Sequence, residues 1–286
     1  MRRIRGNAGA NEILDIAAIV HSLSTPNAVG VRLANGFAER FGKTIQGVRA
    51  RLGGNRSTHH DLEICVRDTQ GVEVWENVEV KGSQPFVPIR PDDSPWLAGV
   101  QFHNGGCEKY SIAKKYAKLY YDIHVGSGSL KRDFSVGAEI PSFEEWFQND
   151  CRVQSDPKTA FGKELKRNVR AVRGPKTSLL ETRAPVLDAL EITEDDRRLL
   201  AQEVLPIANQ ALAEKQYWLT IHGNVHTGEF HFMWFPAFLL SEIQEVHVEK
   251  KLDVLLTFVC ANDFRFHGIL RWGKGAGFSN LRLDLK

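Results

Sequence analysis

Cysteines and long apolar runs are scarce in this chain of 286 residues. The four cysteines, Cys65, Cys107, Cys151 and Cys260, are far apart and form no CxxC pair, which argues against a zinc site and a disulfide framework. No run of about 18 apolar residues occurs, so no membrane span is expected. The basic segment at residues 1–5 is not followed by a long apolar segment, so it lacks the pattern of a signal peptide. These absences predict a protein of the reducing cytoplasm.

Excess charge is also lacking, because the formal net charge is only +2. A surface that binds nucleic acid must therefore be local. An apolar fraction of 42% is ordinary for a globular protein, and no internal repeat or low-complexity linker divides the chain. We expect a single domain over residues 1–286, with a catalytic hairpin at 61–83, a helical middle at 141–215 and a β-rich part at 216–286.

Residues 61–83, DLEICVRDTQGVEVWENVEVKGS, read as two strands joined by a turn. In the first strand, Leu62, Ile64 and Val66 alternate with two acids and a cysteine. The second strand has a valine face, interrupted only by Glu76 and formed by Val72, Val74, Val78 and Val80. Residues 67–71 are polar and end in glycine, as a hairpin connection should.

Folding this hairpin brings Asp61 to within a residue or two of Glu79 and Lys81, on the face away from the valines. Two neighbouring carboxylates repel each other unless a cation lies between them. Oxygen ligands of this kind suit Mg²⁺, which fills its other positions with water and substrate phosphate. We therefore expect Asp61 and Glu79 to bind Mg²⁺, and Lys81 to meet a phosphate oxygen or the attacking water. The alternative is a half-exposed hairpin whose charges face water.

Asp61, followed by Glu79-Val80-Lys81 in an apolar strand, resembles the PD-(D/E)XK nuclease superfamily, to which most type II restriction endonucleases belong. His60 stands where that family usually has a proline. The resemblance implies a restriction-endonuclease-like core and metal-assisted hydrolysis of phosphodiester bonds. It also implies that Asp61, Glu79 and Lys81 are the catalytic residues.

The tripeptide acid-x-Lys occurs five times in the chain, so its context decides its meaning. Pro157 argues against a central strand at residues 156–158, and residues 164–166 lie in a helical pattern. Residues 249–251 lie in a charge cluster, and residues 284–286 end the chain. Only residues 79–81 have an upstream acid on a partner strand.

Residues 8–24 carry an amphipathic helical pattern that ends before Pro26, and a second helix is expected over residues 31–41. Glu12, in the first turn, complements the helix dipole. Nucleases that resemble this chain often have a glutamate on their first helix. The resemblance therefore offers a second interpretation, in which Glu12 is an acid near the metal.

Two loops around the hairpin contain candidate DNA contacts. A glycine-rich basic loop is expected over residues 43–56, and its Arg56 would lie along a phosphate backbone. Residues 84–95 hold four prolines and are expected to be loop. Residues 99–106 read as a short strand that ends in a tight turn. Because polar residues just past the catalytic strand lie near DNA in restriction enzymes, the resemblance implies DNA contacts for Gln101, His103 and Asn104.

The most basic segment is 158–176, which has seven basic residues and one acid. If it is helical, one face carries Lys163, Lys166, Arg170 and Arg173. Such a stripe fits the electrostatic footprint of a DNA-binding surface; the alternative is a solvated helix face. Helices are also expected at 111–122, at 143–147 and from Thr193, whose hydroxyl would cap the helix.

From Tyr217 the hydrophobic period changes to two, which predicts strands at 217–222, 230–235, 252–260 and 264–272. Arg271 lies on the last strand, before a glycine-rich turn that contains Lys274. Arginine and lysine pair with guanine edges in the major groove, so both residues are candidate base contacts. The alternative is a basic β-meander without that role.

These patterns predict an α/β or α+β fold with a central mixed sheet flanked by helices. The resemblance implies a Mg²⁺-dependent type II restriction enzyme of a restriction-modification system. Such an enzyme is expected to act as a homodimer on a palindromic site in double-stranded DNA. Two alternatives remain: a structure-specific or repair nuclease of the same fold, and a DNA-binding protein without catalytic activity.

Overall fold

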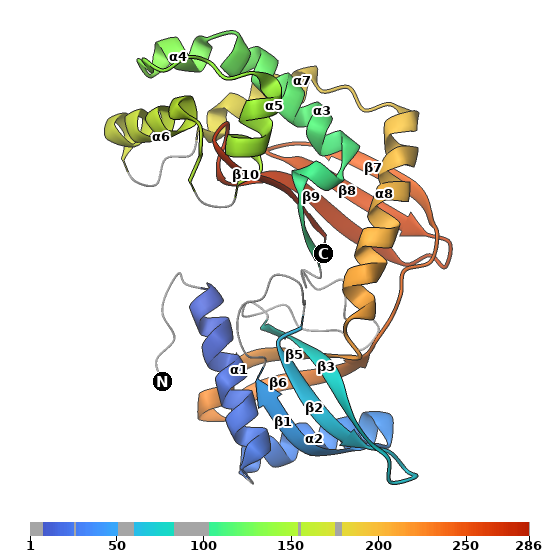
Figure 1. The fold of residues 1–286 in the computed structure, drawn as a ribbon. Helices are drawn as coiled ribbons and strands as arrows, with labels where there is room; N and C mark the ends of the chain where they lie inside the picture. Colours follow the sequence, from blue (N-terminus) through green and yellow to red (C-terminus); the bar gives the residue numbers. More distant parts are fainter. Residues whose placement is uncertain are drawn as a thin grey trace. The chain divides into compact units, whose positions relative to one another are not determined.

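A computed structural model describes residues 8–25, 27–50, 60–82, 103–153, 156–174 and 179–285. Within these ranges, the side chains of residues 8–13, 81–82, 103–105, 222, 274 and 279 are outside the description. The described residues form a mixed α/β fold of helices and two β-sheets (Figure 1). None of the described helices is long and apolar enough to cross a membrane.

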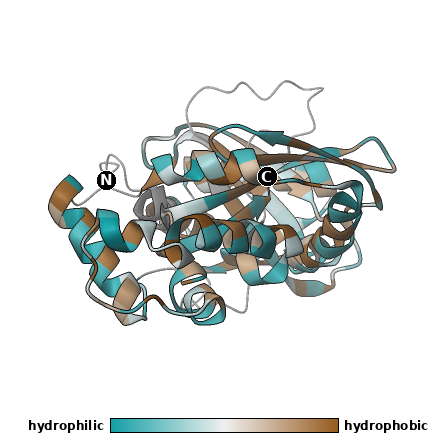
Figure 2. Cartoon of the chain, turned by 90° about the horizontal axis from the view of Figure 1, so that it is seen from above, coloured by the Kyte–Doolittle hydropathy of each residue, from teal (hydrophilic) through white to brown (hydrophobic). Residues whose placement is uncertain are grey.

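The ribbons of the described helices carry both hydrophobic and hydrophilic residues (Figure 2). Their bounds are α1 (Ala8–Ser24), α2 (Ala28–Phe41), α3 (Ser111–Tyr120), α4 (Ser129–Asp133), α5 (Phe143–Trp146), α6 (Ala160–Arg173), α7 (Arg183–Ala189) and α8 (Glu194–Ala213). The helices predicted at 8–24, 31–41, 111–122 and 143–147 correspond to α1, α2, α3 and α5. Residues 160–173 of the basic segment form α6, so the condition on which the predicted basic face depends is met.

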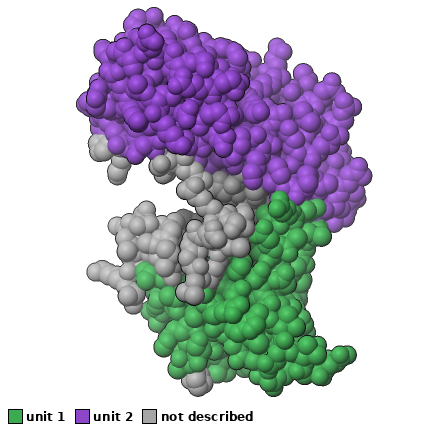
Figure 3. All heavy atoms as spheres, viewed as in Figure 1, with its two compact units in different colours: residues 1–100, 209–239 green, residues 101–208, 240–286 purple. Residues whose placement is uncertain are grey.

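The chain divides into two compact units, one of residues 1–100 and 209–239 and the other of residues 101–208 and 240–286 (Figure 3). In the described part of the chain, each unit contains one five-stranded sheet. The expected single central sheet is therefore two sheets. Strand periodicity identifies strands, but it does not state which strands pair with one another.

The first unit holds a mixed sheet in the order β1-β2-β3-β5-β6. These strands are β1 (Thr44–Ala50), β2 (Leu62–Arg67), β3 (Glu73–Gly82), β5 (Tyr217–Asn224) and β6 (Glu229–Pro236). β3 pairs antiparallel with β2 and parallel with β5, whereas the other pairs are antiparallel. β3 is therefore the strand at which the pairing changes from antiparallel to parallel.

The valine face of the hairpin is buried only in its second half. Val78 and Val80 pack with residues of α1, α2, β2 and β5 in the core of the first unit. Val72 and Val74 are about half exposed, because they precede the part of β3 that the core covers. The sequence predicts one continuous valine face, and the structure limits burial to its far end.

Glu76 interrupts this face because it has a partner at the end of α2. Its carboxylate Oε1 lies 3.4 Å from Nζ of Lys43, which also donates a hydrogen bond of 2.9 Å to the hydroxyl of Tyr217. That hydrogen bond is the main cause of the raised pKa of Lys43. A charged residue is thus accommodated beside an aromatic cluster of Phe37, Phe41 and Tyr217.

The second unit holds an antiparallel sheet in the order β4-β10-β9-β8-β7. Its strands are β4 (His103–Gly106), β7 (Ile243–Lys250), β8 (Val254–Cys260), β9 (Arg265–Gly275) and β10 (Ser279–Leu285). The indole of Trp146, from α5, donates a 2.9 Å hydrogen bond to the carbonyl of Gly277 and lies nearly parallel to Tyr120 of α3. Aromatic burial thus joins α3 and α5 to the turn between β9 and β10.

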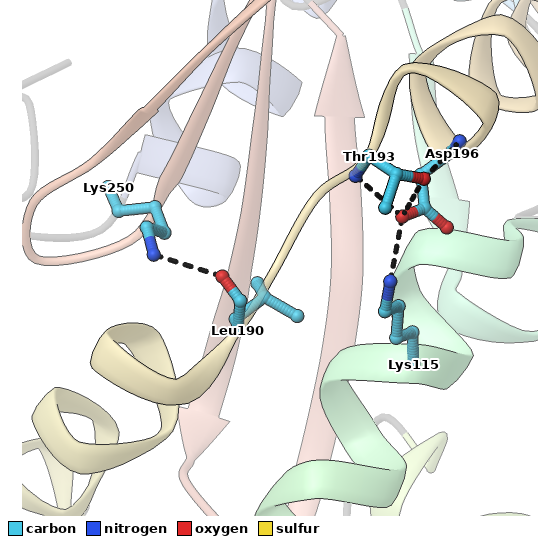
Figure 4. A network of polar contacts seen from close by, with 5 residues as sticks. All are labelled: Lys115, Leu190, Thr193, Asp196 and Lys250. Carbon is cyan, nitrogen blue, oxygen red and sulfur yellow. Dashed lines mark hydrogen bonds and ion pairs between the residues drawn. The ribbon is translucent and has the colours of Figure 1, made fainter.

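The start of α8 is a capping box (Figure 4). The Thr193 hydroxyl accepts a hydrogen bond from the backbone N–H of Asp196, whose carboxylate accepts from the backbone N–H of Thr193 at 2.8 Å. Lys115 of α3 donates to the same carboxylate at 2.7 Å. Nearby, Lys250 of β7 donates a 2.9 Å hydrogen bond to the carbonyl of Leu190. The predicted Thr193 cap is therefore confirmed, and it also joins α8 to α3.

Three strands fall where the sequence predicts none. β1 occupies residues 44–50 of the expected basic loop at 43–56, and β7 and β10 lie outside the predicted strands. β1 forms a ladder with β2 over Thr44–Ala50, whereas β10 pairs with both β9 and β4. Each of the three strands pairs with the neighbouring strand in the chain, and β10 also pairs with the distant β4, so cross-strand pairing rather than local composition places them in the sheets.

Candidate active site

Asp61 is held against the segment of β3 that contains Glu79. Leu62 pairs with Val78, and the backbone N–H of Asp61 donates a 2.9 Å hydrogen bond to the carbonyl of Val78. The carboxylate of Asp61 accepts a 2.8 Å hydrogen bond from the backbone N–H of Val80. The first acid therefore lies beside the residues that flank Glu79, as the hairpin register predicts.

Glu79 lies on the face of β3 opposite the valines, but it is not open to solvent. Only 7% of its surface is exposed, and its Oε2 lies 3.9 Å from Nζ of Lys215, of which 1% is exposed. The ammonium of Lys215 also lies 4.8 Å from the centroid of a Trp218 ring. This arrangement offsets the cost of burying the carboxylate with a neighbouring positive charge.

The turn between α8 and β5 places Lys215 beside Glu79. The side chain of Asn77 donates to the carbonyl of Glu214 at 2.8 Å, and its backbone N–H donates to the Gln216 side chain at 2.8 Å. The backbone N–H of Gln216 in turn donates to the carbonyl of Asn77 at 3.0 Å. Three hydrogen bonds on one residue of β3 therefore fix the turn two positions before Glu79.

Sequence reasoning does not find Lys215. It is one of many lysines, and it lies between the end of a helix and the start of an apolar strand. Lys215 can be recognised as a neighbour of Glu79 only when β3 is known to pair in parallel with β5, since this pairing aligns Glu79 with Trp218.

Lys81 and Glu12 are only partly described. Lys81 lies in β3 two residues beyond Glu79, and its backbone pairs with Thr220 of β5. Its side chain is outside the described residues, as is that of Glu12, which belongs to α1. The carboxyl ends of β3 and β5 point to the same edge of the sheet, which is where ligands bind in sheets with parallel strands.

The carboxylates of Asp61 and Glu79 are hard oxygen donors, which fit Mg²⁺ in kind. Among the described residues, no group of three or more His, Cys, Asp or Glu side chains is arranged to hold a metal ion. Two carboxylates are sufficient for Mg²⁺ when water and substrate phosphate complete its coordination. The positive charge of Lys215 partly neutralises the Glu79 carboxylate and so weakens its attraction for a second cation.

The candidate DNA contacts of the basic segment lie in α6. Lys163, Arg170 and Arg173 are exposed, whereas Lys166 is partly covered and pairs with Asp156. Arg173 pairs with Glu181, and its guanidinium lies 5.4 Å from the centroid of the Phe134 ring. Arg173 is thus engaged by the protein itself, whereas the charges at Lys163 and Arg170 face solvent.

The remaining candidate DNA contacts are described unevenly. Arg56 and Gln101 lie outside the described residues. His103 and Asn104 lie in β4 and Lys274 lies in β9, but none of these three side chains is described. Arg271 of β9 binds Asp284 of β10 through distances of 2.8 Å from Nε and 2.7 Å from Nη2. Asp284 is fully buried, so Arg271 has a structural partner in addition to any role at a surface.

Comparison with known protein families finds no family that matches this chain, and comparison with curated proteins finds no match. The functional argument therefore depends on the residues and their geometry.

Proposed function

We propose that this protein is a Mg²⁺-dependent endonuclease that hydrolyses phosphodiester bonds at a specific sequence in double-stranded DNA. The observation that carries the proposal is the placement of the Asp61 carboxylate on the backbone of β3, one residue beyond Glu79. Lys81 follows on the same strand, at the shared carboxyl edge of β3 and β5. Two carboxylates can hold Mg²⁺, and a nearby lysine can stabilise negative charge that develops on a phosphate, so this set suits metal-assisted phosphodiester hydrolysis.

In this proposal Asp61 and Glu79 would hold Mg²⁺, and the chemistry supplied by the bound ion would be polarisation of the phosphate and a lowered pKa of the attacking water. Lys81 orients that water or stabilises the negative charge that develops on the phosphate. The hydrogen bond from Val80 holds Asp61 in place, and Lys215 holds Glu79 in place. Glu12 is proposed as an auxiliary acid.

The proposed partner is double-stranded DNA, bound by a homodimer because a palindromic site calls for two-fold symmetry. Lys163 and Arg170, whose side chains are exposed on α6, are the described residues best placed for phosphate contacts. A reducing cytoplasmic location is part of the same proposal, and the four cysteines are free thiols.

Digestion of a sequenced plasmid with Mg²⁺, followed by mapping of the ends, tests the function. Discrete fragments are expected from the wild type, and chelation of the metal should stop cleavage reversibly. Heterogeneous ends would point to a structure-specific or repair nuclease. DNA binding without metal-dependent cleavage would contradict a nuclease and favour a binding protein.

A matched pair of variants on β3 tests the site. Glu79→Gln should abolish cleavage, because the neutral amide is a weaker metal ligand. Glu73→Gln should cleave at the wild-type rate, since Glu73 is an exposed carboxylate of the same strand that pairs with Arg67. Equal rates for both variants would exclude Glu79 from the active site.

A further inference from the structure

Helix α6 in the second unit has a buried apolar stripe and exposed basic faces. Phe161, Leu165 and Val169 recur every four residues and are fully or almost fully buried. This stripe fixes the rotation of the helix, so its basic side chains lie away from the core. Lys163, Arg167 and Arg170 are exposed on the other faces of the helix.

A surface hollow of about 300 Å³ lies along this basic side of α6. It is lined by Pro157, one carboxylate and four cationic residues, namely Asp156, Lys163, Lys166, Arg167 and Arg170. Four cations and one carboxylate give a formal lining charge of +3. We call this feature the basic hollow.

Two other hollows of the second unit have balanced charge. One of about 500 Å³ contains two arginines and two glutamates, Arg197, Arg198, Glu194 and Glu242. One of about 350 Å³ contains two lysines and two acids, Lys115, Lys118, Asp122 and Glu191. The basic hollow is therefore distinguished from them by its charge and not by its size.

The end of the basic hollow near residues 156–158 is held by a buried carboxylate. Asp150 is fully buried and accepts hydrogen bonds from the backbone N–H groups of Lys158 at 2.9 Å and Thr159 at 3.0 Å. The Thr159 hydroxyl accepts a 2.9 Å hydrogen bond from the backbone N–H of Gly162 and so caps α6. The backbone beside the hollow is therefore preorganised.

The acid within α6 is engaged elsewhere. Glu164 accepts a 2.9 Å hydrogen bond from the backbone N–H of Ala138, and backbone hydrogen bonds from Ala138 and Gly137 hold its pKa below the usual value. Arg167 lies 3.5 Å from Glu164, and its side chain is 74% exposed. Arg167 thus remains accessible to a ligand in solvent.

We propose that the basic hollow binds a backbone phosphate of double-stranded DNA. Arg167 and Arg170 donate hydrogen bonds to the phosphate from planar guanidinium groups, and Lys163 adds a mobile ammonium. Lys166 leaves its ion pair with Asp156 and pairs with the phosphate instead. This assignment adds Arg167 to the sequence-derived set and sets aside Arg173, which is bound to Glu181. It rests on DNA as the partner in the proposed function, but not on the chemistry of the hairpin.

Duplex binding at several salt concentrations, without metal, tests the proposal. Arg167→Ala is compared with Arg198→Ala, because Arg198 is 72% exposed, lies on a helix and pairs with an acid three residues earlier, as Arg167 does. Arg167→Ala should weaken binding about three- to tenfold and lower the salt slope by about one. Arg198→Ala should change neither quantity.

Asp156→Asn provides a test of opposite sign, since removal of the one carboxylate among the described lining residues should tighten binding to any duplex sequence. The proposal is overturned if Arg167→Ala binds as Arg198→Ala does, or if Asp156→Asn does not tighten binding. Sequence-dependent losses would also overturn it, because they indicate base contacts. A wild type that binds DNA through this hollow but never cleaves it would defeat the nuclease proposal and leave this one intact.

Discussion

Nζ of Lys215 lies 3.9 Å from Oε2 of Glu79, and both side chains are almost completely buried. A charged group that is buried without a partner of opposite charge lowers the stability of the fold. Each member of this pair therefore reduces the free-energy cost of burying the other. The pair also joins the candidate metal ligand on β3 to the turn that follows α8. Stability and the candidate active site are therefore coupled through one ion pair.

Replacing Lys215 should destabilise the first unit. Lys215→Met leaves Glu79 buried without its ammonium partner, and the free energy of unfolding should fall by about 3–5 kcal/mol. The double variant Lys215→Met/Glu79→Gln should lose less than the sum of the two single variants, because no charge remains buried. Urea unfolding followed by tryptophan fluorescence measures this coupling, and Trp218 is a nearby probe.

The control for that experiment is Lys251→Met. Lys251 pairs with Glu249 at 2.8 Å, but both side chains are more than half exposed. Loss of this surface pair should cost about 1 kcal/mol or less. If Lys215→Met costs no more than Lys251→Met, the buried pair does not have the stabilising role assigned to it.

Asp61 should be sensitive to the shape of its replacement as well as to its charge. Asp61→Asn keeps an oxygen acceptor for the N–H of Val80, so its free energy of unfolding should stay within about 0.5 kcal/mol of the wild type. Asp61→Ala leaves that N–H without its side-chain acceptor and should cost about 1–3 kcal/mol. Both variants should lose cleavage by several orders of magnitude, because both lose a metal ligand. Thermal melting and cleavage rates separate the two effects, and cleavage by Asp61→Asn at the wild-type rate would refute the site.

The capping box of α8 should give a pH-dependent contribution to stability. Burial alone would raise the pKa of Asp196, but hydrogen bonds from Lys115 and Thr193 hold it below its ordinary value of 3.8. A carboxylate with a lowered pKa stabilises the fold above pH 3.8, and this contribution is lost as the pH falls through the folded-state pKa. Asp196→Asn should therefore be about 1 kcal/mol less stable at pH 7, and the difference should shrink below about pH 4.

Unfolding curves at several pH values check this expectation for Asp196→Asn. Asp195→Asn serves as the control, because Asp195 lies in the same helical turn and its side chain is 85% exposed. Asp195→Asn should show little difference from the wild type at any pH. A constant deficit for Asp196→Asn down to pH 3 would show that hydrogen-bond geometry, and not charge, accounts for its contribution.

Arg271 should contribute to stability through Asp284. Arg271→Ala removes the donor to a fully buried carboxylate, although Arg282 remains 3.1 Å from its other oxygen. We expect a loss of about 2–4 kcal/mol in the free energy of unfolding. Melting temperature and binding to duplexes of different sequence distinguish the possibilities. An unchanged melting temperature together with altered sequence preference would instead support the base contact that the sequence suggests.

Several local elements follow from the order of the residues alone. The alternation of Leu62, Ile64 and Val66 predicts β2, and the helical patterns of the sequence predict α1, α2 and α3. The hairpin register that brings Asp61 to the level of Glu79 also follows from local alternation and a short turn. These features are encoded locally because a strand repeats every two residues and a helix every 3.6.

The meeting of distant segments becomes visible in the folded chain and not in the sequence. The parallel pairing of β3 with β5 joins residues 78–82 to residues 217–221, and it brings Lys215 and Trp218 beside Glu79. In the same way, β10 pairs with the distant β4 as well as with β9, and Asp284 of β10, which in the sequence is simply an acid near the end of the chain, is fully buried. Hydrophobic period specifies which face of an element is buried but not which element buries it. Burial, and with it the need for a counter-charge, therefore becomes visible only when the sheets are assembled.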